Sequence, residues 1–137
     1  MNPVLTCCSV AVLILAPIFF TGCPLCPCEE TIALATPVLL SPEDGSVFDT
    51  FPRDTTFQWE AVPDAVSYTI EIDCYICCAD DEWCADIDDV YFSQSGIIET
   101  EYEYSWVGAQ PGRWRVKADS PCGEGEWSEW FGFAYTI

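Results

Sequence analysis

The sequence contains no histidine and only four Lys and Arg residues, against 23 Asp and Glu. The lack of histidine excludes a Ser-His-Asp triad, a Cys-His dyad and every histidine-ligated metal site. The formal net charge of -19 excludes electrostatic binding to nucleic acid and to anionic lipid headgroups. We therefore expect an acidic, non-enzymatic protein with no cofactor and no nucleic-acid partner.

The chain also lacks an apolar run long enough to span a membrane. The run from Val10 to Phe20 is shorter than the roughly 20 residues that a bilayer core of about 30 Å requires, and it is typical of a secretory signal. It ends in Phe20-Thr21-Gly22-Cys23, which resembles the bacterial lipobox. The resemblance implies that residues 1–22 are removed, that Cys23 is diacylated, and that the protein is exported and lipid-anchored. Pro24 in place of Asp implies the outer membrane or the cell surface. An ordinary signal peptide cut near Gly22, or a retained anchor, remains open.

Beyond Cys23 the sequence divides into a tether and one domain. Residues 23–36 contain two prolines and little periodicity, which is typical of a tether. From residue 37 onward apolar residues alternate with polar ones, as in half-buried strands. Trp59 is a predicted core residue. The predicted inward positions are Phe57, Trp59, Val66, Tyr68, Ile70, Ile72, Tyr102, Tyr104, Trp106, Trp114, Val116, Ala118, Phe131, Phe133, Tyr135 and Ile137.

The motifs in this region resemble those of a known family. They are Leu40-Ser41-Pro42-Glu43-Asp44-Gly45, Phe57-Gln58-Trp59, Ala65-Val66-Ser67-Tyr68, Trp114-Arg115-Val116-Lys117-Ala118 and Trp127-Ser128-Glu129-Trp130. Residues 37–137 are thereby identified as similar to the fibronectin type III domains of bacterial envelope proteins. The resemblance implies an all-β, immunoglobulin-like sandwich of seven strands. No Tyr begins the expected sixth strand, where Gly112 and Arg113 stand, so a tyrosine corner is not expected.

An insertion of about residues 74–96, longer than a hairpin needs, interrupts the strand pattern. It contains Cys74, Cys77, Cys78 and Cys84. In an exported chain these thiols are expected to oxidise, so we predict two disulfides among them, with the adjacent Cys77 and Cys78 not bonded to each other. The alternatives are a metal site with four thiolate ligands and a redox-active pair.

The insertion is also strongly acidic. Asp80, Asp81, Asp86, Asp88 and Asp89 could bind a divalent cation weakly. No glycine occurs between Gly45 and Gly96, so the Asp-x-Asp-x-Asp-Gly calcium loop is excluded. A solvated acidic loop is the simpler interpretation.

Two groups of large apolar residues are candidate contact sites. Tyr75, Ile76 and Trp83 either cover a small core around the disulfides or present a contact surface. Trp127 and Trp130 resemble the Trp-Ser-x-Trp stretch of cytokine-receptor domains, where such residues have a structural role. Arg113, Arg115 and Lys117 are expected to stack on these indoles, to pair with Glu71 and Asp73, or both; a sugar-binding platform is the alternative.

The pairing of the remaining cysteines is predicted from their number and from the topology of the resembled family. Removing residues 1–22 and acylating Cys23 leaves Cys26, Cys28 and Cys122 besides the four insertion cysteines. In that topology Cys122 and Cys74 lie at opposite ends of the sandwich. We therefore predict a bridge from Cys122 to Cys26 or Cys28.

These predictions favour a lipid-anchored envelope protein that acts as an interaction or adhesion module. The lipid would place it on a membrane, and its partner would be a protein or a polysaccharide that the fold alone does not identify. The alternative function is a metal-binding or thiol-active envelope protein centred on Cys74 to Cys84.

Overall fold

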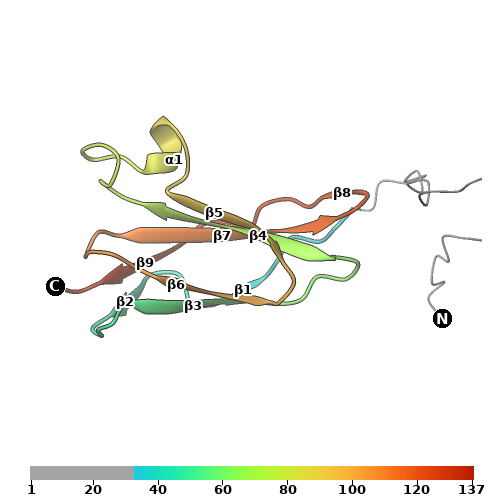
Figure 1. The fold of residues 1–137 in the computed structure, drawn as a ribbon, viewed down its shortest axis with the longest axis horizontal. Coiled ribbons are helices and arrows are strands. Elements are labelled where there is room, and N and C mark those ends of the chain that lie inside the picture. The colour runs from blue at the N-terminus through green and yellow to red at the C-terminus, as the bar shows by residue number, and fades with distance from the viewer. Residues whose placement is uncertain (1–32) are drawn as a thin grey trace, which may run out of the picture.

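The computed structural model describes residues 33–137, which form a sandwich of two β-sheets (Figure 1). The first sheet contains, in spatial order, β1 (Leu39–Ser41), β3 (Asp54–Trp59) and β6 (Glu101–Ser105). The second contains β2 (Ser46–Phe48), β9 (Phe131–Tyr135), β7 (Gly112–Ser120), β4 (Ser67–Cys74) and β5 (Phe92–Ile97), with β8 (Gly123–Glu124) paired to β7. A short helix, α1 (Cys84–Ile87), lies outside both sheets. The predicted all-β sandwich is therefore confirmed.

The strands alternate between core and solvent largely as the sequence predicts. Phe57 and Trp59 on β3 and Trp114 on β7 are almost fully buried. Their rings interlock across the two sheets: the centroids of Phe57 and Trp114 are 5.0 Å apart, and those of Trp59 and Tyr68 are 5.5 Å apart. Such aromatic pairs add to the free energy gained from burying apolar surface. The core predicted around Trp59 is confirmed.

The predicted alternation is wrong at four positions, one of which is Thr69, expected on the solvent face but buried on β4. Val66 is exposed because it precedes β4, and Ile137 is exposed because it lies beyond the end of β9. Asp73, expected on the solvent face, is completely buried near the end of β4. Its carboxylate is satisfied by an arginine and by backbone amides, which is why the charge can be buried.

The insertion is shorter than predicted, and one residue of the predicted tether is buried against the domain. β4 includes Cys74, and Phe92 to Ile97 form β5, which pairs antiparallel with β4, so the insertion comprises residues 75–91. Leu34, expected in the tether, is buried, and a methyl group on Gly125 would lie 3.2 Å from its Cβ. The predicted signal, the lipid site Cys23, and Cys26 and Cys28 lie outside the described residues. Within residues 33–137 no helix is long and apolar enough to cross a bilayer.

The sandwich has two ends with different contents. The N-terminal pole contains Leu34, residues 60–66 and the turn between β7 and β8, whereas the distal pole contains residues 49–53, the insertion 75–91 and residues 106–111 (Figure 1). Strand β7 runs from one pole to the other. Its nine residues, at about 3.3 Å each, separate the poles by roughly 30 Å.

Candidate functional site

The insertion at the distal pole is closed by two disulfides. Cys74 is bonded to Cys77 and Cys78 to Cys84, with Cα–Cα distances of 5.6 Å and 5.3 Å. The prediction that the four cysteines pair among themselves, with Cys77 and Cys78 bonded to different partners, is confirmed. Because each sulfur is in a disulfide, the four-thiolate metal site does not form. Among residues 33–137 no three acidic or cysteine side chains converge as a metal site.

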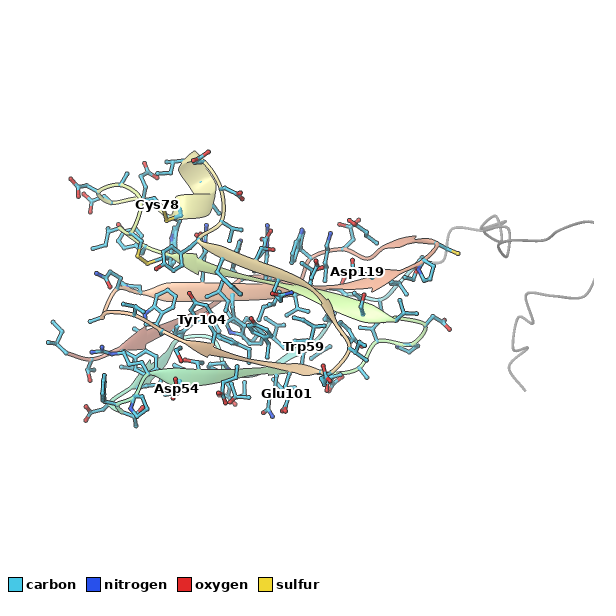
Figure 2. The ribbon with its side chains drawn as sticks, viewed as in Figure 1. Asp54, Trp59, Cys78, Glu101, Tyr104 and Asp119 are labelled. Carbon is cyan, nitrogen blue, oxygen red and sulfur yellow. A yellow bond between two sulfur atoms is a disulfide. The ribbon has the colours of Figure 1, made fainter. Side chains whose placement is uncertain are left out.

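Asp73 fixes the insertion to the sheet. Its carboxylate accepts a hydrogen bond from the Ala85 backbone N–H at 3.2 Å and from that of Tyr91 at 3.4 Å. The Arg113 guanidinium donates to the same carboxylate at 2.9 and 3.0 Å. One buried side chain therefore joins helix α1, the end of the insertion and strand β7. Figure 2 shows the insertion, marked by Cys78, standing above the sheet at this point.

The aromatic residues of the insertion, Tyr75 and Trp83, pack against each other beside the two disulfides, and Trp83 also packs against Arg113. Tyr75 and Trp83 form an isolated β-bridge, and their ring centroids are 5.3 Å apart. The Arg113 guanidinium lies 4.4 Å from the Trp83 ring centroid. Ile76 is instead exposed. Of the two interpretations left open by the sequence, Tyr75 and Trp83 fit the covering role, and Ile76 fits a contact surface.

Outside the insertion, the outer face of β7 carries the predicted ladder of cations and indoles. The Arg113 guanidinium is 4.4 Å from the Trp130 ring, and the Arg115 guanidinium is 4.3 Å from Trp130 and 4.4 Å from Trp127. The Lys117 Nζ lies 5.1 Å from the Trp127 ring. Each stacked pair contributes about 0.5–1 kcal/mol when exposed. Arg115 also pairs with Glu71 at 2.7 Å, so the predicted stacking and the predicted cross-strand ion pairs both occur.

The ladder has the features of a structural element. Cations occupy the indole faces that a sugar-binding platform would need open. Between the two tryptophans, the buried Ser128 accepts a hydrogen bond from the Val116 backbone N–H at its Oγ, at 3.0 Å. This bond attaches residues 127–130 to the edge of β7. These contacts favour the structural role over the sugar platform.

Trp106 joins the three segments of the distal pole. Its backbone N–H donates to the Arg53 carbonyl at 2.8 Å, and its indole N–H donates to the Gln110 carbonyl at 3.2 Å. Its ring lies 6.0 Å from that of Tyr91, at the end of the insertion, and 5.1 Å from that of Phe133 in the core. No tyrosine begins β7, as expected, and Trp106 holds the preceding loop in position. The sequence identified Trp106 only as a core residue.

Around this buried tryptophan the distal pole exposes large apolar side chains. Phe51 is 87% exposed and Val107 is 75% exposed. Ile76, Ile87 and Tyr91 of the insertion are each between 43% and 46% exposed. Apart from Ile76, none of these was singled out from the sequence, because isolated apolar residues in turns carry no periodic signal. Their gathering at one pole becomes visible only in the fold.

The acids of the insertion lie on the same exposed segment as Ile76, Ile87 and Tyr91. Asp86 pairs with Arg113 at 3.0 Å, and Asp89 accepts a hydrogen bond from the neighbouring Val90 N–H at 2.8 Å. Asp80, Asp81 and Asp88, with these two, are all exposed. The structure does not bring the five together as a cation site. It places them as a solvated acidic surface, the simpler interpretation.

A further aromatic cluster fills the space between the edge strands β5 and β6. The Tyr104 ring lies 4.7 Å from Phe92 and 6.4 Å from Trp106. Burial raises the pKa of the Tyr104 phenol above its ordinary value of 10.0, and the phenols of Tyr91 and Tyr102 raise it further. Figure 2 marks Tyr104 between the two sheets.

Cys122 lies at the opposite pole from the insertion. It is disulfide-bonded, and its partner is none of the insertion cysteines, because those pair with one another. This agrees with the predicted separation of Cys122 from Cys74. The predicted partners, Cys26 and Cys28, lie outside the described residues.

The sandwich resembles solved structures, although no family model and no curated protein matches the sequence. An Fn3-like protein from Clostridium thermocellum superposes with a TM-score of 0.50 at 19% identity, covering 79% of this chain and 97% of that one. The FN1–FN3 domains of chicken CNTN1 give a TM-score of 0.49 at 13% identity, covering 74% of this chain and 34% of that one. At such identities the likeness concerns the fold alone. The chain therefore has a fibronectin type III-like β-sandwich.

Proposed function

We propose that this protein is an exported, lipid-anchored envelope protein that binds another macromolecule through its distal pole and has no enzymatic activity. The observation that carries the proposal is the position of the insertion. Two disulfides and the buried Asp73 hold it at the end of the sandwich opposite the point where the described chain begins. A tether attached at the N-terminal pole would leave the distal pole directed away from the membrane.

The rigidity of the distal pole supports a binding role. A loop that is already ordered loses little conformational entropy when it binds, so more of the interaction energy appears as affinity. Loops held by few hydrogen bonds or disulfides would lose more conformational entropy on binding. Here the disulfides, Asp73 and Trp106 constrain all three segments of the pole.

Two experiments test this function in cells that produce the full chain. For the anchor, the protein is labelled with a fatty-acid analogue; Cys23→Ala should abolish the label and release the protein from membranes, and continued membrane attachment would contradict the anchor. For binding, a photo-crosslinking amino acid is placed in turn at exposed positions on both poles. At least one position should give a specific adduct, and a complete lack of adducts would contradict a binding function.

A further inference from the structure

We infer that the distal pole docks a protein segment that is positively charged and presents apolar side chains. This inference rests on the binding function proposed above and specifies the partner. The surface, called here the distal surface, consists of Phe51, Ile76, Ile87, Tyr91 and Val107. It spans three chain segments that are remote in sequence, and the loop 106–111 is hydrogen-bonded to each of the other two.

Backbone hydrogen bonds and one ring contact connect the three segments that carry these side chains. The Arg53 guanidinium lies 6.0 Å from the Phe51 ring, the Arg53 backbone carbonyl accepts a hydrogen bond from the Trp106 N–H, and Val107 follows Trp106 directly. The ring of Tyr91 lies against Trp106. The Tyr75 N–H donates to the Pro111 carbonyl at 3.0 Å, which brings the insertion against the loop 106–111. Exposed apolar groups gathered in this way mark interaction sites more often than scattered ones do.

The charge around this surface decides the kind of partner. Residues 75–91 contain six acids and no cation: Asp80, Asp81, Glu82, Asp86, Asp88 and Asp89. One of these charges is balanced within the described chain, by Arg113. By contrast, Glu71 and Glu124 on the outer face of the second sheet have paired cations. Negative potential around an apolar centre attracts a cationic partner and repels anionic surfaces, including acidic lipid headgroups.

The side chains themselves favour protein over polysaccharide. Three of the five, Ile76, Ile87 and Val107, are aliphatic, and they lack the flat face on which a sugar ring stacks. The tryptophans that could offer such a face, Trp127 and Trp130, have cations stacked on them. An apolar centre inside a charged rim is the usual anatomy of a protein–protein interface.

In-cell crosslinking locates the contact and identifies the partner's chemistry. The photo-crosslinking residue replaces Val107 in one variant and Ile98, which is 77% exposed at the N-terminal pole, in the control. We expect the Val107 adduct to be about tenfold more abundant than the Ile98 adduct. Protease should degrade the crosslinked partner, and the partner peptide that remains attached at position 107 should carry a net positive charge. An adduct from Ile98 alone, a protease-resistant adduct degraded by periodate, or a neutral or acidic peptide would overturn the inference. The last two outcomes leave binding through the distal pole standing, an adduct from Ile98 alone moves the binding site to the other pole, and no adduct from any exposed position contradicts a binding function altogether.

Binding of defined peptides tests the two halves of the inference separately. The probes are an alternating Lys–Leu peptide and, at equal length, Lys–Ser and Glu–Leu peptides, titrated into the purified mature protein in detergent. The Lys–Leu peptide should bind about tenfold more tightly than either control. Ile87→Ser with Val107→Ser should weaken it about tenfold, and the matched pair Val66→Ser with Ile98→Ser by less than about twofold. Equal binding of the three peptides, or equal loss in both variants, would refute the docking surface.

Discussion

Replacing Asp73 by alanine should release the insertion from the sheet and destabilise the whole domain. The change removes the acceptor of the Ala85 and Tyr91 backbone amides and the partner of Arg113. Each amide bond contributes about 0.5–1 kcal/mol and the charge-assisted bonds about 1.5–3 kcal/mol. Such contributions are not additive, and removing one partner of a buried ion pair usually costs about 3–5 kcal/mol in all, which is the loss expected here.

The matched control is Glu71→Ala, which removes the equivalent partner of Arg115 on the same strand. Glu71 accepts hydrogen bonds from Arg115 but is not completely buried, and its bonds do not reach the insertion. Its loss should cost about 1 kcal/mol. In a domain with about 5–15 kcal/mol of total stability, the two variants should therefore be easily separated.

Urea unfolding and amide hydrogen exchange measure the two effects. Asp73→Ala should lower the unfolding free energy by about 3–5 kcal/mol, with a melting temperature lower by roughly 12 °C or more. The amides of Ala85 and Tyr91 should exchange much faster in this variant than in Glu71→Ala. Equal stability of the two variants, or unchanged protection of these amides, would refute the role assigned to Asp73.

Three further predictions concern the core, the cysteines and pH. Trp59→Ala should lower the unfolding free energy by about 3–5 kcal/mol in a thermal or urea melt; a change below about 1 kcal/mol would contradict the core. Peptide mapping without reductant should recover the two insertion disulfides separately, with Cys122 linked to neither. Folding raises the pKa of the Tyr104 phenol. The stability that the protonated phenol contributes is therefore fully present below about pH 10 and is lost as the pH rises through the pKa of the folded state. The melting temperature should thus fall more between about pH 9 and 11 in the native protein than in Tyr104→Phe, and equal falls would contradict that cause.

The sequence predicted the sandwich because its core positions repeat with period two. Phe57, Trp59, Trp114 and Val116 alternate with polar residues and are buried as expected. Strand β5 was missed because Ser93-Gln94-Ser95-Gly96 contains no apolar residue. Its pairing with β4 is determined by the neighbouring strand, which local sequence does not reveal.

The site was predicted only in part, for a similar reason. The insertion disulfides were predicted from the cysteines of a chain expected to be exported, and the stacking of Arg115 on its tryptophans from strand alternation together with the resemblance to the Trp-Ser-x-Trp stretch. The same alternation placed Asp73 in solvent, since a buried carboxylate depends on partners that are distant in sequence. The distal surface has no sequence signature, because Phe51 and Val107 come from separate turns that only the fold brings together.

The native mass of the membrane-extracted protein tests most directly whether it is a binding module that uses its distal pole. The full chain is extracted from cells in mild detergent and measured by size-exclusion chromatography with light scattering. The native chain and the control Val66→Ser with Ile98→Ser should both elute in a complex larger than the protein alone. The variant Ile87→Ser with Val107→Ser should elute as the protein alone. A complex of unchanged mass in that variant would contradict binding through the distal pole.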